Sequence, residues 1–204
     1  DNLADKTISD SIEFNIKIVA LSSFYYTSPL PGGHNIYTKY AYPDADGKNI
    51  IIQNSFPKGV PYTHPNGKNI GYRIFWTRVM NETASVLDLN IHFPADSFAI
   101  SSQPESYFKL FVIPGTMTPD KESLDSYGSG LESFLDTTFY KPTSLHRTIH
   151  PKEECLLNIG LAIPVNGVAR TGLVLKGQDL FYSVSISGQL DSALIPCGQI
   201  VIKN

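Results

Sequence analysis

The chain has few cysteines, no long apolar run and no cluster of basic residues, and each scarcity excludes a class of protein. Only Cys155 and Cys197 occur among 204 residues, without a Cys-x-x-Cys pair, so neither structural zinc nor dithiol redox chemistry is indicated. No run of 18 apolar residues is present, so no transmembrane helix is predicted. The net charge is −3 and lysine and arginine are scattered, which gives a nucleic acid or an anionic membrane no electrostatic attraction.

Recognisable catalytic motifs are also missing. The sequence contains no Gly-x-Ser-x-Gly, no phosphate-binding loop and no dinucleotide fingerprint, so no catalytic residue and no cofactor are predicted. Paired carboxylates such as Glu153 and Glu154 are typical of a solvated surface. The cluster with the most catalytic character is His92 beside Asp88 and Asn90, which we interpret as a polar strand face. A hydrolase built on Asp88 and His92 is the alternative.

The residues that are present favour one β-rich domain with a sizeable core. Hydrophobic residues make up 42% of the chain and charged residues 17%, a balance that favours folding over disorder. Fifteen glycines and 14 prolines are spread along the chain as turn signals, which is typical of all-β proteins. No linker divides the sequence, so we expect a single domain over residues 1–204.

The amino-acid composition of the sequence is typical of an exported domain. Tyrosine, asparagine, serine and threonine are frequent and cysteine is scarce, which favours a periplasmic, cell-surface or secreted location. No signal peptide is recognisable, and the chain begins at Asp1 with a polar stretch. We expect such a beginning for a processed precursor or a trimmed chain.

Alternating apolar and polar residues predict strands along most of the chain. The first is expected at 11–21, and the segment 22–35 after it is rich in proline and glycine and should be irregular. Two copies of Tyr-x4-Gly-Lys-Asn-Ile, at 42–50 and 62–70, predict two hairpin tips. Further strands are expected at 49–54, 70–80, 86–93, 107–113, 145–150, 155–163, 171–175, 179–186 and 199–203.

Residues 118–136 interrupt this pattern. Thr118 as N-cap, Pro119 at the first helical position and acidic residues in the first turn predict a helix to about residue 127, followed by a second turn at 131–136. The predicted fold is therefore an all-β antiparallel sandwich, immunoglobulin-like or jelly-roll, with one short helical crossover around residues 118–136.

Residues 70–93 are predicted to form a central hairpin. If Met80 lies opposite Val86, then Arg78 faces Asp88 and Trp76 faces Asn90, and the apolar residues of the second strand share one face. In this register a ligand-binding patch is expected on the other face, with an aromatic ring for stacking and amide, imidazole and guanidinium groups for hydrogen bonds. Its residues are Trp76, Arg78, Asn90, His92 and Tyr72. For Trp76 itself a buried or half-buried position is favoured over binding, because Ile74 and Met80 share its face; a loop such as 22–35 could cover it.

Four other features are interpreted as structural. Asp44-Ala-Asp46-Gly47 begins like a calcium loop but lacks the later oxygen ligands, so a turn is expected. His146 and His150 are four apart on a predicted strand, about 13 Å from each other, which is too far to share a metal. Asn81-Glu-Thr83 is a glycosylation sequon at a turn, relevant only in a eukaryotic secretory pathway. The two cysteines are expected to be reduced and buried, with a disulfide as the alternative.

The function expected from the sequence is binding without catalysis. The partner is expected to be a protein or a glycan, contacted by an exported binding or adhesion domain. A carbohydrate-binding module that uses Trp76 and nearby tyrosines is the first alternative, and the hydrolase is the second.

Overall fold

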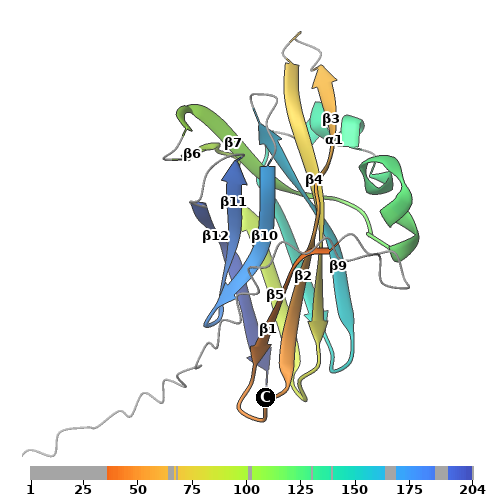
Figure 1. Ribbon diagram of the computed structural model, residues 1–204, viewed down its shortest axis with the longest axis vertical. Helices are drawn as coiled ribbons and strands as arrows, with labels where there is room; N and C mark the ends of the chain where they lie inside the picture. Colours follow the sequence, from red (N-terminus) through yellow and green to blue (C-terminus); the bar gives the residue numbers. More distant parts are fainter. Residues whose placement is uncertain are drawn as a thin grey trace, which may run out of the picture.

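The computed structural model describes residues 36–63, 67, 69–100, 103–129, 131–138, 140–163, 169–186 and 193–203, and within them the chain forms twelve strands in a two-sheet sandwich (Figure 1). The predicted all-β sandwich is thereby confirmed. The strand expected at 11–21 and the loop expected at 22–35 lie outside these residues.

One sheet has seven antiparallel strands in the order β1, β2, β4, β9, β7 and β6, with β3 paired to the part of β4 that β2 does not reach. Its strands are β1 (Ile36–Pro43), β2 (Asn49–Ser55), β3 (Lys58–Thr63), β4 (Asn69–Asn81), β6 (Phe98–Ile100), β7 (Gln103–Ile113) and β9 (Glu154–Ile163). The other sheet has five antiparallel strands in the order β10, β11, β12, β5 and β8. Its strands are β5 (Val86–Phe93), β8 (Thr143–Ile149), β10 (Ala169–Lys176), β11 (Asp179–Ile186) and β12 (Ala193–Lys203).

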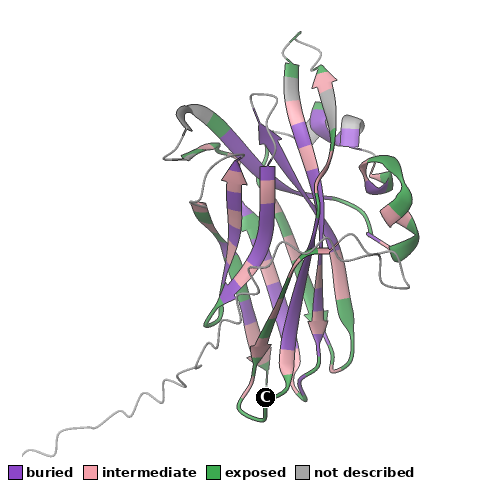
Figure 2. Cartoon of the chain, in the orientation of Figure 1, coloured by how far each residue is buried: buried purple, intermediate pink, exposed green. Residues whose placement is uncertain are grey.

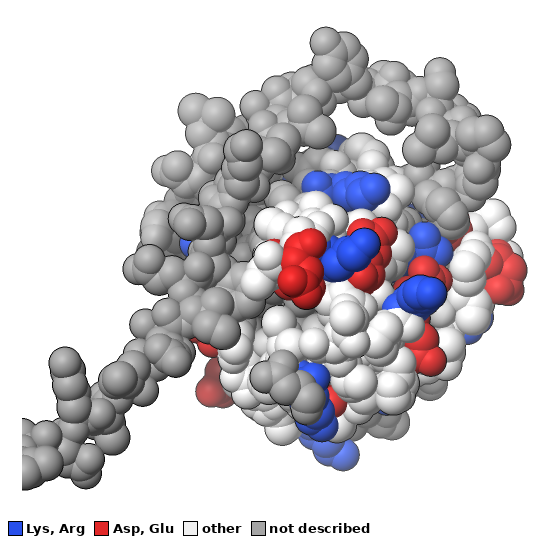
Figure 3. All heavy atoms as spheres, turned by 90° about the horizontal axis from the view of Figure 1, so that it is seen from below, with Lys and Arg blue, Asp and Glu red and all other residues white. Residues whose placement is uncertain are grey.

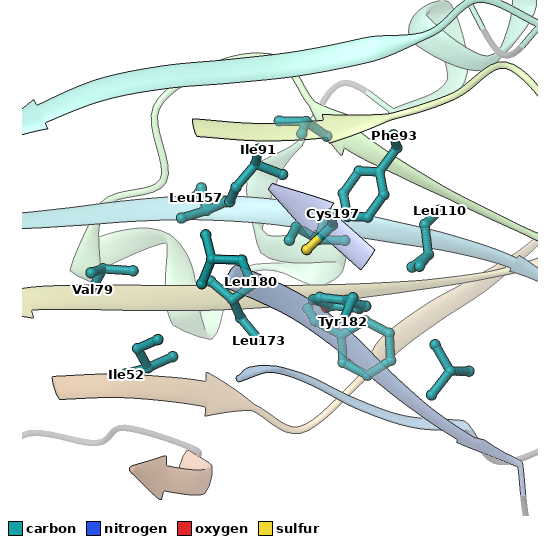
Figure 4. Packing of buried hydrophobic residues seen from close by; sticks show 14 of the residues in the cluster. Ile52, Val79, Ile91, Phe93, Leu110, Leu157, Leu173, Leu180, Tyr182 and Cys197 are labelled. Atoms are coloured by element: carbon teal, nitrogen blue, oxygen red, sulfur yellow. The ribbon is translucent and has the colours of Figure 1, made fainter. Parts of the chain in front are cut away.

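The core lies between the two sheets because their strands alternate apolar and polar residues. In β11, every second residue from Leu180 to Ile186 is buried. Figure 2 shows buried residues alternating with more exposed ones along several strands. Side chains from both sheets meet in Figure 4, where Leu110 of β7 and Leu157 of β9 come from one sheet and Leu180 of β11 comes from the other. Within the five-stranded sheet, Phe93 of β5 lies close to Tyr182 of β11. Their ring centroids are 5.9 Å apart at an interplanar angle of 82°, the edge-to-face geometry that aromatic pairs favour.

The predicted hairpin between β4 and β5 is wrong, because the two strands belong to different sheets. β4 pairs with β2, β3 and β9, whereas β5 pairs with β12 and β8. Arg78 lies opposite Gln53 and Leu156, and Asp88 lies opposite Val201 and Thr148. The turn between β4 and β5 therefore carries the chain from one sheet to the other.

Apolar and polar residues do alternate along β4 and β5, but the two strands do not pair with each other. Leu87, Leu89, Ile91 and Phe93 are all buried, as are Phe75 and Val79 of β4. These two apolar faces meet across the core rather than side by side in one sheet. A period of two assigns residues to faces, and it does not say whether consecutive strands hydrogen-bond or arch between sheets.

Both hairpin tips predicted from the repeated motif are confirmed. β1 pairs with β2 across the turn at 44–48, and β3 pairs with β4 across a tip that lies mostly outside the described residues. In the first turn, the carboxylate Oδ1 of Asp44 accepts hydrogen bonds from the backbone N–H of Asp46 (3.0 Å) and of Lys48 (2.8 Å). Gly47 has φ +73°, a conformation that glycine adopts without steric cost. The Asp-x-Asp-Gly sequence is thus a turn, as expected.

The helical crossover connects β7 to β8 and consists of two 3₁₀ turns, η1 (Pro119–Ser123) and η2 (Asp125–Gly128), and the helix α1 (Leu131–Thr138). It covers part of the outer face of the seven-stranded sheet (Figure 1). A second apolar cluster forms there, from Tyr72, Ile74, Trp76, Phe111, Ile113, Met117, Tyr127, Leu131, Phe134, Leu135 and Ala162. None of the helices in the described part of the chain is long and apolar enough to cross a membrane.

The helix predicted from Pro119 to residue 127 begins where expected and ends early. The Thr118 side chain makes no capping hydrogen bond, and Leu124 is already extended (φ −75°, ψ 152°). Ser126 and Tyr127 are left-handed, with φ of 50° and 52°. Tyr127 is 1% exposed, and its hydroxyl donates to the carbonyl of Phe56 at 2.7 Å. Burial of this ring fixes the backbone against the sheet and breaks the helix.

A buried amide joins the two sheets at the edge where β2 faces β10. The Asn54 side chain is 0% exposed, and its Oδ1 accepts from the Leu173 N–H at 2.8 Å while its Nδ2 donates to the Leu173 carbonyl at 3.1 Å. The amide thereby pairs with both polar groups of one residue on the edge of β10, as a neighbouring strand would. Gly172 is required beside it, since a Cβ there would lie 2.9 Å from Asn54 Nδ2.

Candidate functional site

The structure divides the predicted ligand patch between two opposite surfaces. Trp76 and Tyr72 lie on the outer face of the seven-stranded sheet and belong to the cluster under the helical crossover. Their exposed fractions are 1% and 0%, so neither ring is available for stacking on a ligand in this conformation. Burial also raises the pKa of the Tyr72 hydroxyl well above its usual value. The prediction of Trp76 as an exposed anchor was therefore wrong, and the buried position favoured for it describes the structure.

Close packing around Tyr72 explains why this face takes large rings. The Tyr72 and Phe111 rings are 6.3 Å apart in an edge-on arrangement, and Phe111 stacks on Phe134 of α1 at 5.4 Å. Phe111 lies directly over Gly160 of β9, where a Cβ would come within 2.2 Å of the ring. A side chain at position 160 would push Phe111 off the sheet.

Arg78 lies farther along the same face and is only half-buried. Its Nη2 forms an ion pair with Glu154 of β9 at 3.4 Å. The partner predicted for it, Asp88, is in the other sheet and makes different contacts. Arg78 is thus separated from the predicted patch residues of β5.

Asn90 and His92 project from β5 on the outer face of the five-stranded sheet. They do so because Leu89, Ile91 and Phe93 point inward to the core, and successive residues of a strand alternate between faces. Asn90 lies opposite His146 of β8, and His92 lies opposite Ser144 of the same strand. Of the five predicted patch residues, only Asn90 and His92 are brought together.

These two residues line a shallow groove of about 500 Å³ on the outer face of the five-stranded sheet. We call its polar residues the groove face; they are Asn90, His92, Ser144, His146 and Gln199, with Ile91, Leu145 and Gly198 completing the lining. Two amides, two imidazoles and a hydroxyl can each donate and accept hydrogen bonds. The groove face can therefore hold a polar, uncharged group by several hydrogen bonds at once.

Gly198 makes the groove possible. Its φ is +144°, and a Cβ there would lie 1.9 Å from the carbonyl oxygen of Asn90. The register between β11 and β12 shifts at this point, since Leu180 faces Gly198 while Phe181 faces Pro196. The resulting bulge turns Cys197 into the core and sets Gln199 directly opposite Asn90.

Asp88 is engaged at one end of the same sheet face. Its Oδ2 forms an ion pair with Lys203 of β12, and its Oδ1 accepts a hydrogen bond from the Thr148 hydroxyl at 3.0 Å. The hydrogen bond from Lys203, and after it that from Thr148, lowers the pKa of the carboxyl group. Asp88 is therefore ionised at neutral pH and structurally bound, which does not suit a general acid.

Asp88 and His92 do not form a catalytic pair in this conformation. They are four residues apart on one extended strand, about 13 Å at ~3.3 Å per residue. Asp88 is 9% exposed, whereas His92 is exposed and lies beyond Asn90 along the strand. A carboxylate orients an imidazole only at hydrogen-bond distance, so the geometry does not support the hydrolase alternative.

In the described part of the chain, no group of three or more histidine, cysteine or acidic side chains is placed to hold a metal ion. His146 lies on β8 and His150 just after it, so the strand expected there is confirmed.

The side chain of Asn81, the first residue of the glycosylation sequon, is buried and hydrogen-bonded within the fold. Asn81 is 1% exposed, and its Nδ2 donates to the carbonyls of Ser85 (2.8 Å) and Ile149 (3.0 Å). Its Oδ1 accepts from the N–H and the hydroxyl of Thr83 at 3.0 and 2.7 Å. This amide orders the turn from β4 to β5 and joins it to the end of β8. Its nitrogen is unavailable for glycosylation in the folded chain.

Both cysteines are free thiols, as expected. Cys197 is 2% exposed in the core, and its sulfur lies among apolar side chains in Figure 4. Cys155 is half-buried at the start of β9. Burial raises the pKa of Cys197 to about 12 and also raises that of Cys155, so both are poor nucleophiles at neutral pH.

Sequence reasoning missed three contributors to the groove: Ser144, His146 as a binding residue, and Gln199. They belong to β8 and β12, which follow β5 by about 55 and 110 positions. Their alternation with buried neighbours places them on an outer face, but only the strand order places them beside Asn90. Comparisons with protein-family models, curated proteins and solved structures each found no match.

Proposed function

We propose that this chain is a non-catalytic, exported binding domain that contacts its partner through the groove face. The observation that carries the proposal is the convergence of five hydrogen-bonding side chains from three strands in one groove. Four of them, His92, Ser144, His146 and Gln199, are exposed. A rigid sheet holds these groups in fixed relative positions, which limits the entropy lost when a ligand binds.

The chemistry of the groove favours a glycan or a polar protein segment as partner. The groove face carries no carboxylate, ammonium or guanidinium group, so recognition would depend on hydrogen bonds and shape. Acidic and basic side chains are interspersed on the end of the sandwich seen in Figure 3, which also favours a partner that is not selected by net charge. A carbohydrate module based on Trp76 loses its aromatic platform, whereas glycan binding by the groove face needs no exposed tryptophan.

A glycan array probed with the labelled full chain tests this proposal. Binding to a defined glycan class should be lost when Asn90 and Gln199 are both replaced by alanine. The matched control is Gln178→Ala, which removes an exposed amide from the β10–β11 turn of the same sheet. If the double variant binds as well as the control, the groove face is not the binding surface.

Parallel pull-downs with candidate protein partners cover the second partner class, using the same variants. Turnover of a glycan, ester or peptide that is lost on changing His92 or Asp88 would overturn the non-catalytic part of the proposal. The exported location is tested separately, by fractionating cells that express the full gene product; retention in the cytoplasm would refute it.

A further inference from the structure

Two exposed aromatic rings and one arginine meet at the edge where β1 and β2 face β10. Tyr37 and Phe56 are 40% and 42% exposed, and their ring centroids are 5.3 Å apart at an interplanar angle of 57°. The guanidinium carbon Cζ of Arg170 lies over both rings, 5.7 Å from the centroid of Tyr37 and 5.5 Å from that of Phe56. Both distances are in the range of cation–π contacts. We call these three residues the aromatic–arginine patch.

The three residues come from separate elements of the two sheets. Tyr37 lies at the register shift of β1, between residues that pair with two consecutive positions of β2. It is therefore the extra residue of a β-bulge, a feature that turns a side chain away from the direction that regular alternation would give it. Phe56 follows the last residue of β2, and Arg170 lies near the start of β10 in the five-stranded sheet.

Hydrogen bonds fix the backbone that carries the patch. The Asn54 amide donates to the Thr38 hydroxyl of β1 at 3.0 Å, and it also pairs with both backbone groups of Leu173 on β10. The Phe56 carbonyl accepts from the Tyr127 hydroxyl at 2.7 Å. Each patch residue is thus held at its own position or within three positions of it, so little backbone entropy is lost when a ligand binds.

The guanidinium of Arg170 keeps donors for an anion. Its Nη1 donates to the carbonyl of Ala169 at 3.3 Å, and no carboxylate of the described residues forms an ion pair with it. A guanidinium has five N–H donors in one plane, and contact through its face leaves the edge free to bind a carboxylate by two parallel hydrogen bonds. The patch therefore combines a carboxylate-binding group with open aromatic surface.

We propose that the aromatic–arginine patch binds a glycan that carries a carboxylate, as uronic and sialic acids do. The apolar C–H face of the sugar packs on Tyr37 or Phe56, and the carboxylate accepts hydrogen bonds from Arg170. The carboxylate of such a sugar is attached directly to its ring, so one sugar residue reaches from an aromatic ring to the guanidinium beside it. An acidic peptide side chain has no ring face next to its carboxylate, and it would leave the aromatic surface uncovered.

This site is separate from the groove face and does not depend on it. The groove face belongs to β5, β8 and β12, whereas Arg170 lies on β10, which β11 separates from β12. The groove face carries no cationic lysine or arginine, so it has no matching preference for a carboxylate. Separate variants can therefore test the two surfaces.

Titration calorimetry of the full chain with three acidic oligosaccharides, which contain galacturonate, glucuronate or sialic acid, tests the proposal. At least one should bind, and its uncharged methyl ester should bind about tenfold more weakly or worse, because hydrogen bonds to a charged group are lost. Arg170→Ala should cause a similar loss, and Arg170→Lys a smaller one, because lysine keeps the charge without the two parallel donors. Phe56→Ala should weaken binding of the acid and of the ester alike, since the ring contacts the sugar and not its charge.

The matched control is Arg147→Ala. Arg147 is an exposed arginine whose Nη1 also donates to the carbonyl of the preceding residue, at 3.0 Å, and it lies on β8 at the opposite edge of the sheet from β10. Affinity for the acidic oligosaccharide should be unchanged in this variant. It should also be unchanged when Asn90 and Gln199 of the groove face are both replaced by alanine.

Three outcomes would overturn the proposal: no binding of any of the three oligosaccharides, equal binding of acid and ester, or full affinity in Arg170→Ala. A loss of acid binding in the groove-face double variant but not in Arg170→Ala would assign the acid to the groove face. If Arg170→Ala does not fold, the comparison of acid with ester in the unmodified chain and the Phe56→Ala variant decide the result.

Discussion

Replacement of Asn54 by alanine should destabilise the sandwich more than any surface change, because one side chain satisfies groups of both sheets. It pairs with the N–H and the C=O of Leu173, and it also accepts from the Thr77 hydroxyl at 2.9 Å and donates to the Thr38 hydroxyl at 3.0 Å. Leu173 is 0% exposed, so its two backbone groups would be left without a partner and without water. The hydroxyls can rotate toward other acceptors, so the loss is dominated by Leu173.

Leaving a buried donor or acceptor unpaired costs about 1–3 kcal/mol, so two such groups predict a loss of roughly 3–5 kcal/mol in the free energy of unfolding. In a domain of this size, 1 kcal/mol lowers the melting temperature by about 2–4 °C, so a decrease of roughly 6–20 °C is expected. Urea unfolding followed by tryptophan fluorescence measures the first quantity, and calorimetry measures the second. Asn90→Ala is the matched control and should change the free energy by no more than ~0.5 kcal/mol, as is usual for surface sites.

A second variant separates the donor from the acceptor. Asn54→Asp keeps an oxygen for the Leu173 N–H but buries a negative charge against the Leu173 carbonyl. Its stability should be low at neutral pH and should rise as pH falls, because burial raises the pKa of such a carboxyl and the protonated form can donate again. A loss below ~1 kcal/mol for Asn54→Ala, with the m-value unchanged, would show that the inter-sheet amide is not important and would refute the reasoning.

Three further core and thiol predictions and one pH prediction follow from the described contacts. Trp76→Ala should lower the free energy of unfolding by about 3–5 kcal/mol, measured by urea titration, because the ring is buried. Gly160→Ala should cost about 1–3 kcal/mol in the same assay, since the ring above it must shift. Cys155 and Cys197 should react with a thiol reagent slowly in native protein and as two thiols on unfolding without reductant; fewer than two would indicate a disulfide. The folded-state pKa of Asp88 is lowered, so its ion pair stabilises fully above about pH 4 and is lost as pH falls further. Asp88→Asn should therefore show a weaker pH dependence of the urea midpoint below pH 4 than the unmodified chain.

Strand positions and faces were predictable because a period of two is a local property. Leu89 to Phe93 alternate in the sequence and alternate in burial, and the same holds for β11. The pairing of β4 with β5 was not predictable in this way. A connection of four residues (82–85) suits a hairpin and also suits an arch between sheets, and the arch is fixed by Asn81, whose amide joins the turn to β8.

Polar residues misled sequence reasoning where they are buried. Asn81 looked like a surface sequon, and Asn54 looked like an ordinary strand residue. The asparagine side chain carries a donor and an acceptor in one plane. A buried asparagine can therefore make the hydrogen bonds that a neighbouring strand would make at the edge of a sheet. Nothing in a single sequence distinguishes this role from solvent exposure, because the composition of the neighbouring residues is the same in both cases.

The candidate site was half predictable for a related reason. Asn90 and His92 were placed on a polar strand face, and that face forms part of the groove. Trp76 belongs to this face only if β4 is the neighbour of β5, whereas the actual neighbours, β8 and β12, come much later in the chain. The helical crossover then decides which outer face stays open. It covers Trp76 and Tyr72 on one sheet, so a ligand that needs fixed polar groups without an aromatic platform is best accommodated on the other sheet.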